Sequence, residues 1–122
     1  MASKLMIDID HVDDETLKKI LGTRKFVIFY FKLHIEEVLV FRTKHGYHIY
    51  ISVEEDLDDE TTLFIQTLLG DDFKRACFNY TRVKLKIANW NVLFTENEKY
   101  DIKLSKEIYS ILKEGEEEEI VE

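Results

Sequence analysis

Two strand-like segments joined by a short polar turn constrain this chain more than any other feature. Residues 35–42 (IEEVLVFR) and 47–53 (YHIYISV) are rich in β-branched and aromatic residues, which favour strands. The four residues between them, Thr43-Lys44-His45-Gly46, include a glycine that can adopt a positive φ in a tight turn. The sequence therefore predicts an antiparallel hairpin over these residues.

Three further segments have strand character. Residues 4–10 alternate, with Leu5, Ile7 and Ile9 on one side and Met6, Asp8 and Asp10 on the other, which predicts a strand with one buried face. Residues 26–33 (FVIFYFKL) are almost continuously apolar, which predicts a central, buried strand. Residues 91–95 (NVLFT) predict a short one.

Helices are expected between these strands. They cover residues 13–22, 63–69, 71–82 and 101–112, with Asp58 or Asp59 as an N-cap and Gly70 as a C-terminal residue. The resulting order, β-α-β-β-β-α-α-β-α, predicts an α+β fold. We expect a mostly antiparallel sheet flanked by helices, with an RNA-recognition-motif-like or ferredoxin-like core.

The length of 122 residues predicts one domain, which we place at residues 1–113, followed by an acidic, disordered tail at 114–122. Six of the 25 acidic residues lie in that tail, so the other 19 nearly balance the 17 basic residues. The net charge of -8 is therefore no argument against nucleic-acid binding, and the near-neutral body is no argument for it.

The single cysteine excludes an intramolecular disulfide and a cysteine-cluster metal site, and it suits a reducing compartment. The apolar runs are too short to span a bilayer, and the N-terminus lacks a signal-peptide pattern. We therefore expect a cytoplasmic protein with no membrane contact.

Two carboxylates share one face of the first strand. Asp8 and Asp10 are two residues apart, so both project to the same side. Such a pair can bind a hard cation, Mg²⁺ or Mn²⁺, together with substrate phosphates. The alternative is a solvated strand face without a metal.

The hairpin carries a second group of polar residues. Thr43, Lys44 and Arg42 surround Gly46 and could hold a triphosphate or a nucleic-acid backbone. A neutral imidazole of His48, on the following strand, could donate a hydrogen bond to a phosphate or orient a metal-bound group. The alternative is an ordinary hairpin with a polar outer face.

These two segments together resemble motifs of the archaeo-eukaryotic primase and primase-polymerase superfamily, over roughly residues 5–95. Met6-Ile7-Asp8-Ile9-Asp10 resembles its metal-binding strand, and the stretch from Thr43 to Tyr50 resembles its nucleotide-binding hairpin. The resemblance implies that Asp8 and Asp10 bind Mg²⁺ or Mn²⁺, that His48 is catalytic, and that Thr43, Lys44 and Gly46 hold a nucleoside triphosphate. The chain departs from the family at Asn91, where a third metal-binding aspartate is expected.

Basic residues cluster with aromatic ones further along the chain. Lys74, Arg75, Arg82 and Lys84 lie near Phe78, Tyr80 and Trp90, a combination suited to nucleic-acid phosphates and bases. With Arg42, they are the nucleic-acid-binding candidates. One alternative is a solvated helix face above core aromatics, and another is an internal salt bridge between Arg75 and Asp71 or Asp72.

The sequence thus favours a small nucleic-acid- or nucleotide-handling protein with a primase-like core, of the kind found in archaeal plasmids and viruses and associated with replication. If it is an enzyme, its reaction is metal-dependent nucleotidyl transfer. The competing hypothesis is a non-catalytic interaction module without a metal site, which binds a protein partner or forms a homodimer.

Overall fold

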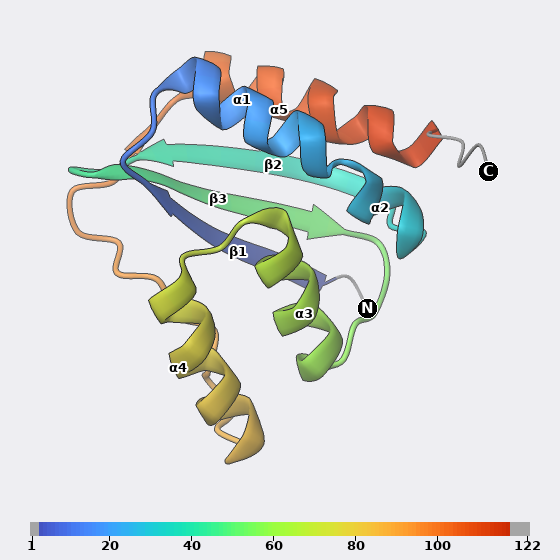
Figure 1. Cartoon of the computed structure of the whole chain (residues 1–122), viewed down its shortest axis with the longest axis vertical. Helices are drawn as coiled ribbons and strands as arrows, with labels where there is room; N and C mark the ends of the chain where they lie inside the picture. The colour runs from blue at the N-terminus through green and yellow to red at the C-terminus, as the bar shows by residue number, and fades with distance from the viewer. Residues whose placement is uncertain (1–2, 118–122) are drawn as a thin grey trace.

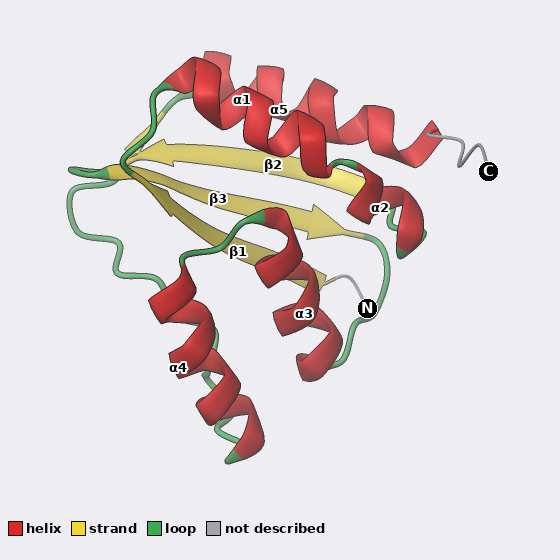
Figure 2. Cartoon of the chain, in the orientation of Figure 1, coloured by secondary structure: helices red, strands yellow, loops and turns green. Residues whose placement is uncertain are grey.

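The structure, a computed structural model, describes residues 3–117 and contains a four-stranded antiparallel sheet flanked by helices (Figures 1 and 2). The predicted α+β class is confirmed. The strands are β1 (Ser3–Asp10), β2 (Ile35–Arg42), β3 (Gly46–Val53) and β4 (Lys99–Tyr100). The helices are α1 (Asp14–Arg24), α2 (Phe26–Tyr30), α3 (Asp59–Leu69), α4 (Phe73–Lys84) and α5 (Ile102–Glu114), and a 3₁₀ turn, η1 (Gly115–Glu117), follows α5.

The strands lie in the order β1-β3-β2-β4, so β3 is paired on both sides. The expected hairpin between β2 and β3 is present, and β1 pairs antiparallel with the other edge of β3. In this register Asp8 lies opposite His48, and Met6 lies opposite Tyr50. The register therefore places the acidic strand and the histidine strand side by side.

The hydrophobic core lies on one face of the sheet. The odd-numbered residues of β1, Leu5, Ile7 and Ile9, are buried there, while the even-numbered residues project to the other face. Helices α1, α2, α3 and α5 contribute the opposing apolar side chains. In Figure 1, α1 and α5 lie together along one side of the sheet, and α3 lies beside β1.

Four of the helices begin at an aspartate. The side chains of Asp13, Asp58, Asp72 and Asp101 each accept a hydrogen bond from the backbone N–H three residues later, which satisfies a free donor of the first turn. Helix α3 ends at Gly70, which has the left-handed conformation, φ 111°, typical of a C-terminal glycine.

The predicted strand at residues 26–33 is wrong, because this segment forms α2 and a turn. Val27 and Ile28 are adjacent and both fully buried, which a strand with one covered face cannot achieve. A helical turn places both against the core, and Lys32, at φ 53°, then turns the chain into β2. Tertiary packing therefore overrides the strand propensity of the aromatic run.

The predicted strand at residues 91–95 is also absent, and β4 forms later, at Lys99–Tyr100. The chain before it is anchored by Trp90, which is buried with Leu63 and Val83 between α3 and α4. From there an irregular segment, residues 91–98, leads back to the sheet.

The acidic segment is ordered over its first residues. Glu114 ends α5, and Glu116 accepts a hydrogen bond from the backbone N–H of Ile35 through Oε1. Residues 118–122, the rest of the expected tail, lie outside the described residues. Within residues 3–117, no helix combines the length and apolar character needed to cross a membrane.

Candidate functional site

The sheet face opposite the core brings Asp8 and His48 together. His48 Nε2 lies 3.7 Å from Asp8 Oδ1, and the His48 side chain is only 9% exposed. Asp8 Oδ1 is buried and, within the described part of the chain, accepts no hydrogen bond. A buried carboxylate oxygen without a donor is costly, so this atom is a natural position for a cation or a proton.

The electrostatics of Asp8 point the same way. Burial raises the pKa of Asp8 to about 6, and the negative charge of Asp10 adds to the increase. Positive charge on His48 would act in the opposite direction but is outweighed. The oxygen donors of Asp8 and Asp10 therefore fit Mg²⁺ or Mn²⁺, which would relieve the repulsion between the two carboxylates.

Glu98 joins the site from the irregular segment before β4. One of its oxygens, Oε2, lies 2.6 Å from His48 Nδ1 and accepts a hydrogen bond of 2.6 Å from the Tyr50 hydroxyl. Its side chain is only 10% exposed. Sequence reasoning missed Glu98, because it is 50 residues from His48 and lies in a loop without periodicity.

A pocket of about 260 Å³ opens beside this cluster, and we name it the β1–α4 pocket. Its strand side presents Asp8 and His48, and the start of α4 adds Asp72. The remaining lining residues come from α4 and the segment that crosses the sheet: Lys74, Arg75, Phe78, Arg82, Val92, Leu93 and Phe94. Carboxylates and an imidazole thus line one opening together with cations and aromatic rings.

Two of the pocket's rings are available for stacking. Phe78 is 63% exposed and Phe94 is 88% exposed. Arg82 lies over the Phe78 ring, with its guanidinium carbon 5.9 Å from the centroid, and it donates to Asn79 Oδ1 over 3.2 Å. Arg82 and the exposed Lys74 are therefore the cations of α4 best placed to meet a ligand in the pocket.

Arg75, although it lines the pocket, is mainly a structural residue. It is buried, and it donates to Asp71 Oδ2 at 2.7 Å, to the carbonyl of Met6 at 3.0 Å and to Asn91 Oδ1 at 2.7 Å. Asp71 Oδ1 in turn accepts from the backbone N–H of Asp8. The guanidinium charge is thus used to join α4 to the edge of β1.

The same network satisfies further backbone groups of this strand edge, at Met6 and Asp8. The backbone N–H of Met6 donates to Gln66 Oε1 at 2.9 Å, and the carbonyl of Asp8 accepts from the N–H of Asp72 at 2.8 Å. Asn91 donates to Gln66 Oε1 at 2.7 Å. Covering an edge strand in this way prevents pairing with another chain. Asn91, which stands where the resemblance expects an aspartate, is therefore a structural link.

The turn residues predicted to bind a nucleotide do not line the β1–α4 pocket. Thr43 Oγ1 accepts a hydrogen bond from the N–H of Gly46, which closes the turn, and Lys44 is exposed. The expected positive φ at Gly46 is not found. The glycine is required for another reason: a Cβ there would lie 2.2 Å from the carbonyl oxygen of Ile9. The close approach is to β1 and not to a ligand.

Arg42 lies away from the pocket, on the helix-covered face. Its guanidinium binds Asp14 at 2.6 Å and Asp101 at 2.7 Å, and it stacks over the Tyr47 ring, whose hydroxyl also donates to Asp14. The network joins the starts of α1 and α5 to the sheet. The charge predicted for nucleic acid is therefore neutralised internally.

Lys84, the last nucleic-acid candidate, also lies outside the pocket lining. Its Nζ is 3.9 Å from Glu60 Oε1 and 5.5 Å from the centroid of the Tyr80 ring. The side chain is 55% exposed, so it can reach solvent. Of the five basic candidates, only Lys74, Arg75 and Arg82 gather at one site.

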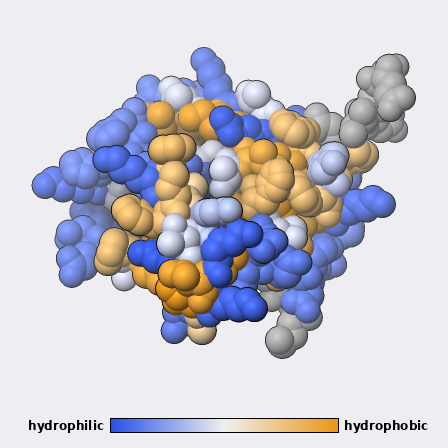
Figure 3. All heavy atoms as spheres, turned by 60° about the horizontal axis from the view of Figure 1, so that its bottom comes forward, coloured by the Kyte–Doolittle hydropathy of each residue, from blue (hydrophilic) through white to orange (hydrophobic). Residues whose placement is uncertain are grey.

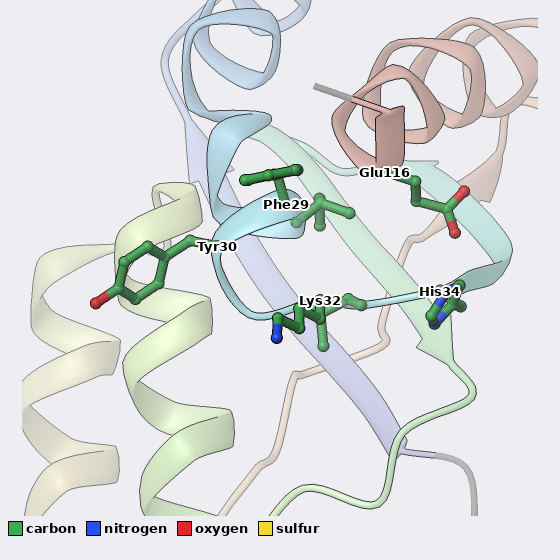
Figure 4. Close-up of a pocket in the computed structure, with 7 residues that line it drawn as sticks. Phe29, Tyr30, Lys32, His34 and Glu116 are labelled. Carbon is green, nitrogen blue, oxygen red and sulfur yellow. The ribbon is translucent and has the colours of Figure 1, made fainter. Parts of the chain in front are cut away.

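A second polar group lies at the far end of the hairpin strands. His34, Glu54 and Glu55 offer ligand atoms within 4.8 Å of one another, and among the described residues this is the one group of three or more that does so. His34 Nδ1 already pairs with Glu55 Oε2 at 2.7 Å. His34 also borders a pocket of about 380 Å³ formed by α2 and Glu116 (Figure 4). This largely exposed group is a second candidate for metal binding, and experiments must control for it.

The surface around α4 mixes apolar and charged side chains. Figure 3, in which the α4 end of the molecule comes forward, shows orange and blue patches interleaved on this face.

Comparisons with protein-family models, curated proteins and solved structures found no match to the chain. Function must therefore be argued from the site.

Proposed function

We propose that this chain binds nucleotides, either free or within a single-stranded nucleic acid, in the β1–α4 pocket. One observation carries the proposal: Asp8 and His48 line one pocket together with Lys74, Arg82 and the exposed ring of Phe78. A nucleotide offers phosphates, which bind cations, and a base, which stacks on aromatic rings. The pocket presents both kinds of partner at once.

The roles follow from chemistry. Lys74 and Arg82 contact phosphate oxygens, and the base stacks on Phe78 or Phe94. Asp8 and Asp10 hold Mg²⁺ or Mn²⁺, which neutralises phosphate charge. The resemblance to the primase superfamily supports this location, because Asp8 and His48 come from the two resembling motifs. The proposal is limited to binding, because Asn91 offers no third carboxylate.

Binding of a labelled single-stranded oligonucleotide, measured by fluorescence anisotropy over a salt series, tests the proposal. Calorimetry with a nucleoside triphosphate and Mg²⁺ tests the free nucleotide. The Lys74→Ala/Arg82→Ala variant should weaken oligonucleotide binding and lower the log–log salt slope by roughly 1.4, since each phosphate contact in a single strand contributes about 0.7. The matched control is Lys103→Ala/Lys106→Ala, which removes the same charge from the exposed surface of α5.

Two outcomes would contradict the proposal. One is no saturable binding of either ligand by the wild type. The other is an equal loss of affinity in the pocket and control variants, which would indicate non-specific attraction. A stable dimer that binds neither ligand would favour the interaction-module hypothesis instead.

A further inference from the structure

We infer that His48 Nε2 and Asp8 Oδ1 are two ligands of one transition-metal ion, and that Glu98 is the positioning residue that aims the imidazole at it. From the sequence, His48 was expected to contact the nucleotide or to orient a metal-bound group, and only carboxylates were expected to ligate the metal itself. The inference deepens the proposed function and rests on it only for the choice of pocket. It shifts the preferred metal from Mg²⁺ or Mn²⁺ to Co²⁺ or Zn²⁺.

The hydrogen bonds of Glu98 determine which nitrogen of His48 faces the pocket. An ionised carboxylate can only accept, so Nδ1, at 2.6 Å from Glu98 Oε2, carries the proton. The Tyr50 hydroxyl donates to the same oxygen and holds it in place. In the neutral ring, Nε2 is then left with a lone pair. Metal-binding histidines are commonly oriented by a carboxylate in this way.

The atoms across the gap are suitably spaced. Nε2 and Asp8 Oδ1 are 3.7 Å apart, too far for a direct hydrogen bond. With metal–ligand bonds of about 2.1 Å, two ligands stand roughly 3.0 Å apart at a right angle and roughly 4.2 Å apart in line. The observed separation falls between these limits, and Oδ1 has no other partner among residues 3–117. Both residues line the β1–α4 pocket, so a metal ion can enter.

A mixed nitrogen and oxygen ligand set selects the metal. Imidazole nitrogen suits Mn²⁺ poorly to moderately and Zn²⁺ or Co²⁺ well, whereas Mg²⁺ prefers oxygen alone. We therefore expect affinity to rise from Mg²⁺ through Mn²⁺ to Co²⁺ and Zn²⁺, with roughly a tenfold or greater difference between the ends of the series. A site of carboxylates only would show a much flatter series.

The competing explanation is a direct ion pair between a protonated His48 and Asp8, with no metal. The test uses metal alone, without nucleotide, so that its failure is separate from failure of the proposed function. Mn²⁺ is titrated into the full chain and free Mn²⁺ is followed by electron paramagnetic resonance, with Mg²⁺, Co²⁺ and Zn²⁺ as competitors. His48→Gln should weaken binding roughly tenfold or more, and Glu98→Gln should weaken it about 10- to 100-fold.

Two readouts separate metal coordination from structural damage. His34→Ala is the matched control: it removes the histidine of the exposed His34, Glu54 and Glu55 group and should leave the tight site intact. In the wild type, substoichiometric Mn²⁺ should broaden the His48 ring signals before those of His34, a result that needs no variant. Glu98→Gln should also shift the ring ¹⁵N resonances of His48, because it changes the tautomer balance.

The inference is overturned if the wild type shows no saturable metal binding, if binding survives His48→Gln, or if His34→Ala alone abolishes it. It is supported if binding is weakened roughly tenfold or more in His48→Gln, unchanged in His34→Ala, and strongest for Co²⁺ and Zn²⁺.

Discussion

Replacing Asp8 with asparagine should stabilise the metal-free protein. The pKa of Asp8 is raised from 3.8 to about 6, so the ionised carboxylate is disfavoured in the folded state. A shift of this size corresponds to about 3 kcal/mol, since one pKa unit is about 1.36 kcal/mol. The side chain is 21% exposed, and solvent reduces the cost, so we expect a gain of about 1–3 kcal/mol at about pH 7.5.

The raised pKa of Asp8 also fixes the direction in which wild-type stability changes with pH. Folded Asp8 holds its proton more tightly than unfolded Asp8, so wild-type stability falls as pH rises from about 4 to about 6 and then levels off. The asparagine side chain of the variant cannot ionise, so the variant lacks this loss. The difference between variant and wild type should therefore be small at about pH 4 and reach its plateau above about pH 6.5.

Urea denaturation in a chelator, from about pH 4 to about pH 8, measures this difference. Asp56→Asn, at an exposed loop position, is the control and should leave the pH profile unchanged. The reasoning is refuted if Asp8→Asn destabilises the protein at the upper end of this range, or if its effect is the same at every pH. Without chelator, saturating Mn²⁺ should stabilise the wild type and not Asp8→Asn, because only the former keeps the ligand.

Three further predictions concern residues with structural roles. Arg75→Ala should cost about 3–5 kcal/mol in urea denaturation, because it leaves the buried carboxylate of Asp71 without its partner; a loss below about 1 kcal/mol would contradict this. Gly46→Ala should cost about 2 kcal/mol or more, because its Cβ would meet the Ile9 carbonyl at 2.2 Å, and an unchanged urea midpoint would show that β1 can move aside. Arg42→Ala should lower the thermal midpoint by a few degrees and leave oligonucleotide affinity within about twofold of the wild type; a large loss of affinity would return Arg42 to the binding surface.

Local patterns were sufficient for much of the fold. The alternation in β1, the hairpin turn before Gly46 and the cap at Asp58 each depend on neighbours in sequence, and each was predictable. The conformation of residues 26–33 was not predictable, because it depends on where α1 ends relative to the core and not on neighbours in sequence. Strand propensity reflects how well a side chain fits a half-buried sheet surface, and it does not decide between a buried strand and a buried helical turn.

Some residues of the candidate site were likewise predictable from the sequence, and others were not. The resemblance of their two segments to motifs of one family suggested that Asp8 and His48 share a site, and the register of β1 with β3 sets them opposite each other. Glu98 reaches them through an irregular segment whose path has no sequence signature. The sequence allowed Arg75 to be either a surface cation of α4 or a salt-bridge partner of Asp71 or Asp72. The salt bridge to Asp71 is present, and the contact with the β1 edge had no sequence signal.

Mapping nucleoside triphosphate binding on the protein by amide chemical shifts tests the central claim most directly. With Mg²⁺ present, we predict saturable shifts centred on β1 around Asp8, β3 around His48, α4 between Lys74 and Arg82, and Phe94. Residues around His34 and α2 should not move. No saturable shift, or shifts centred on the pocket beside His34, would contradict the account.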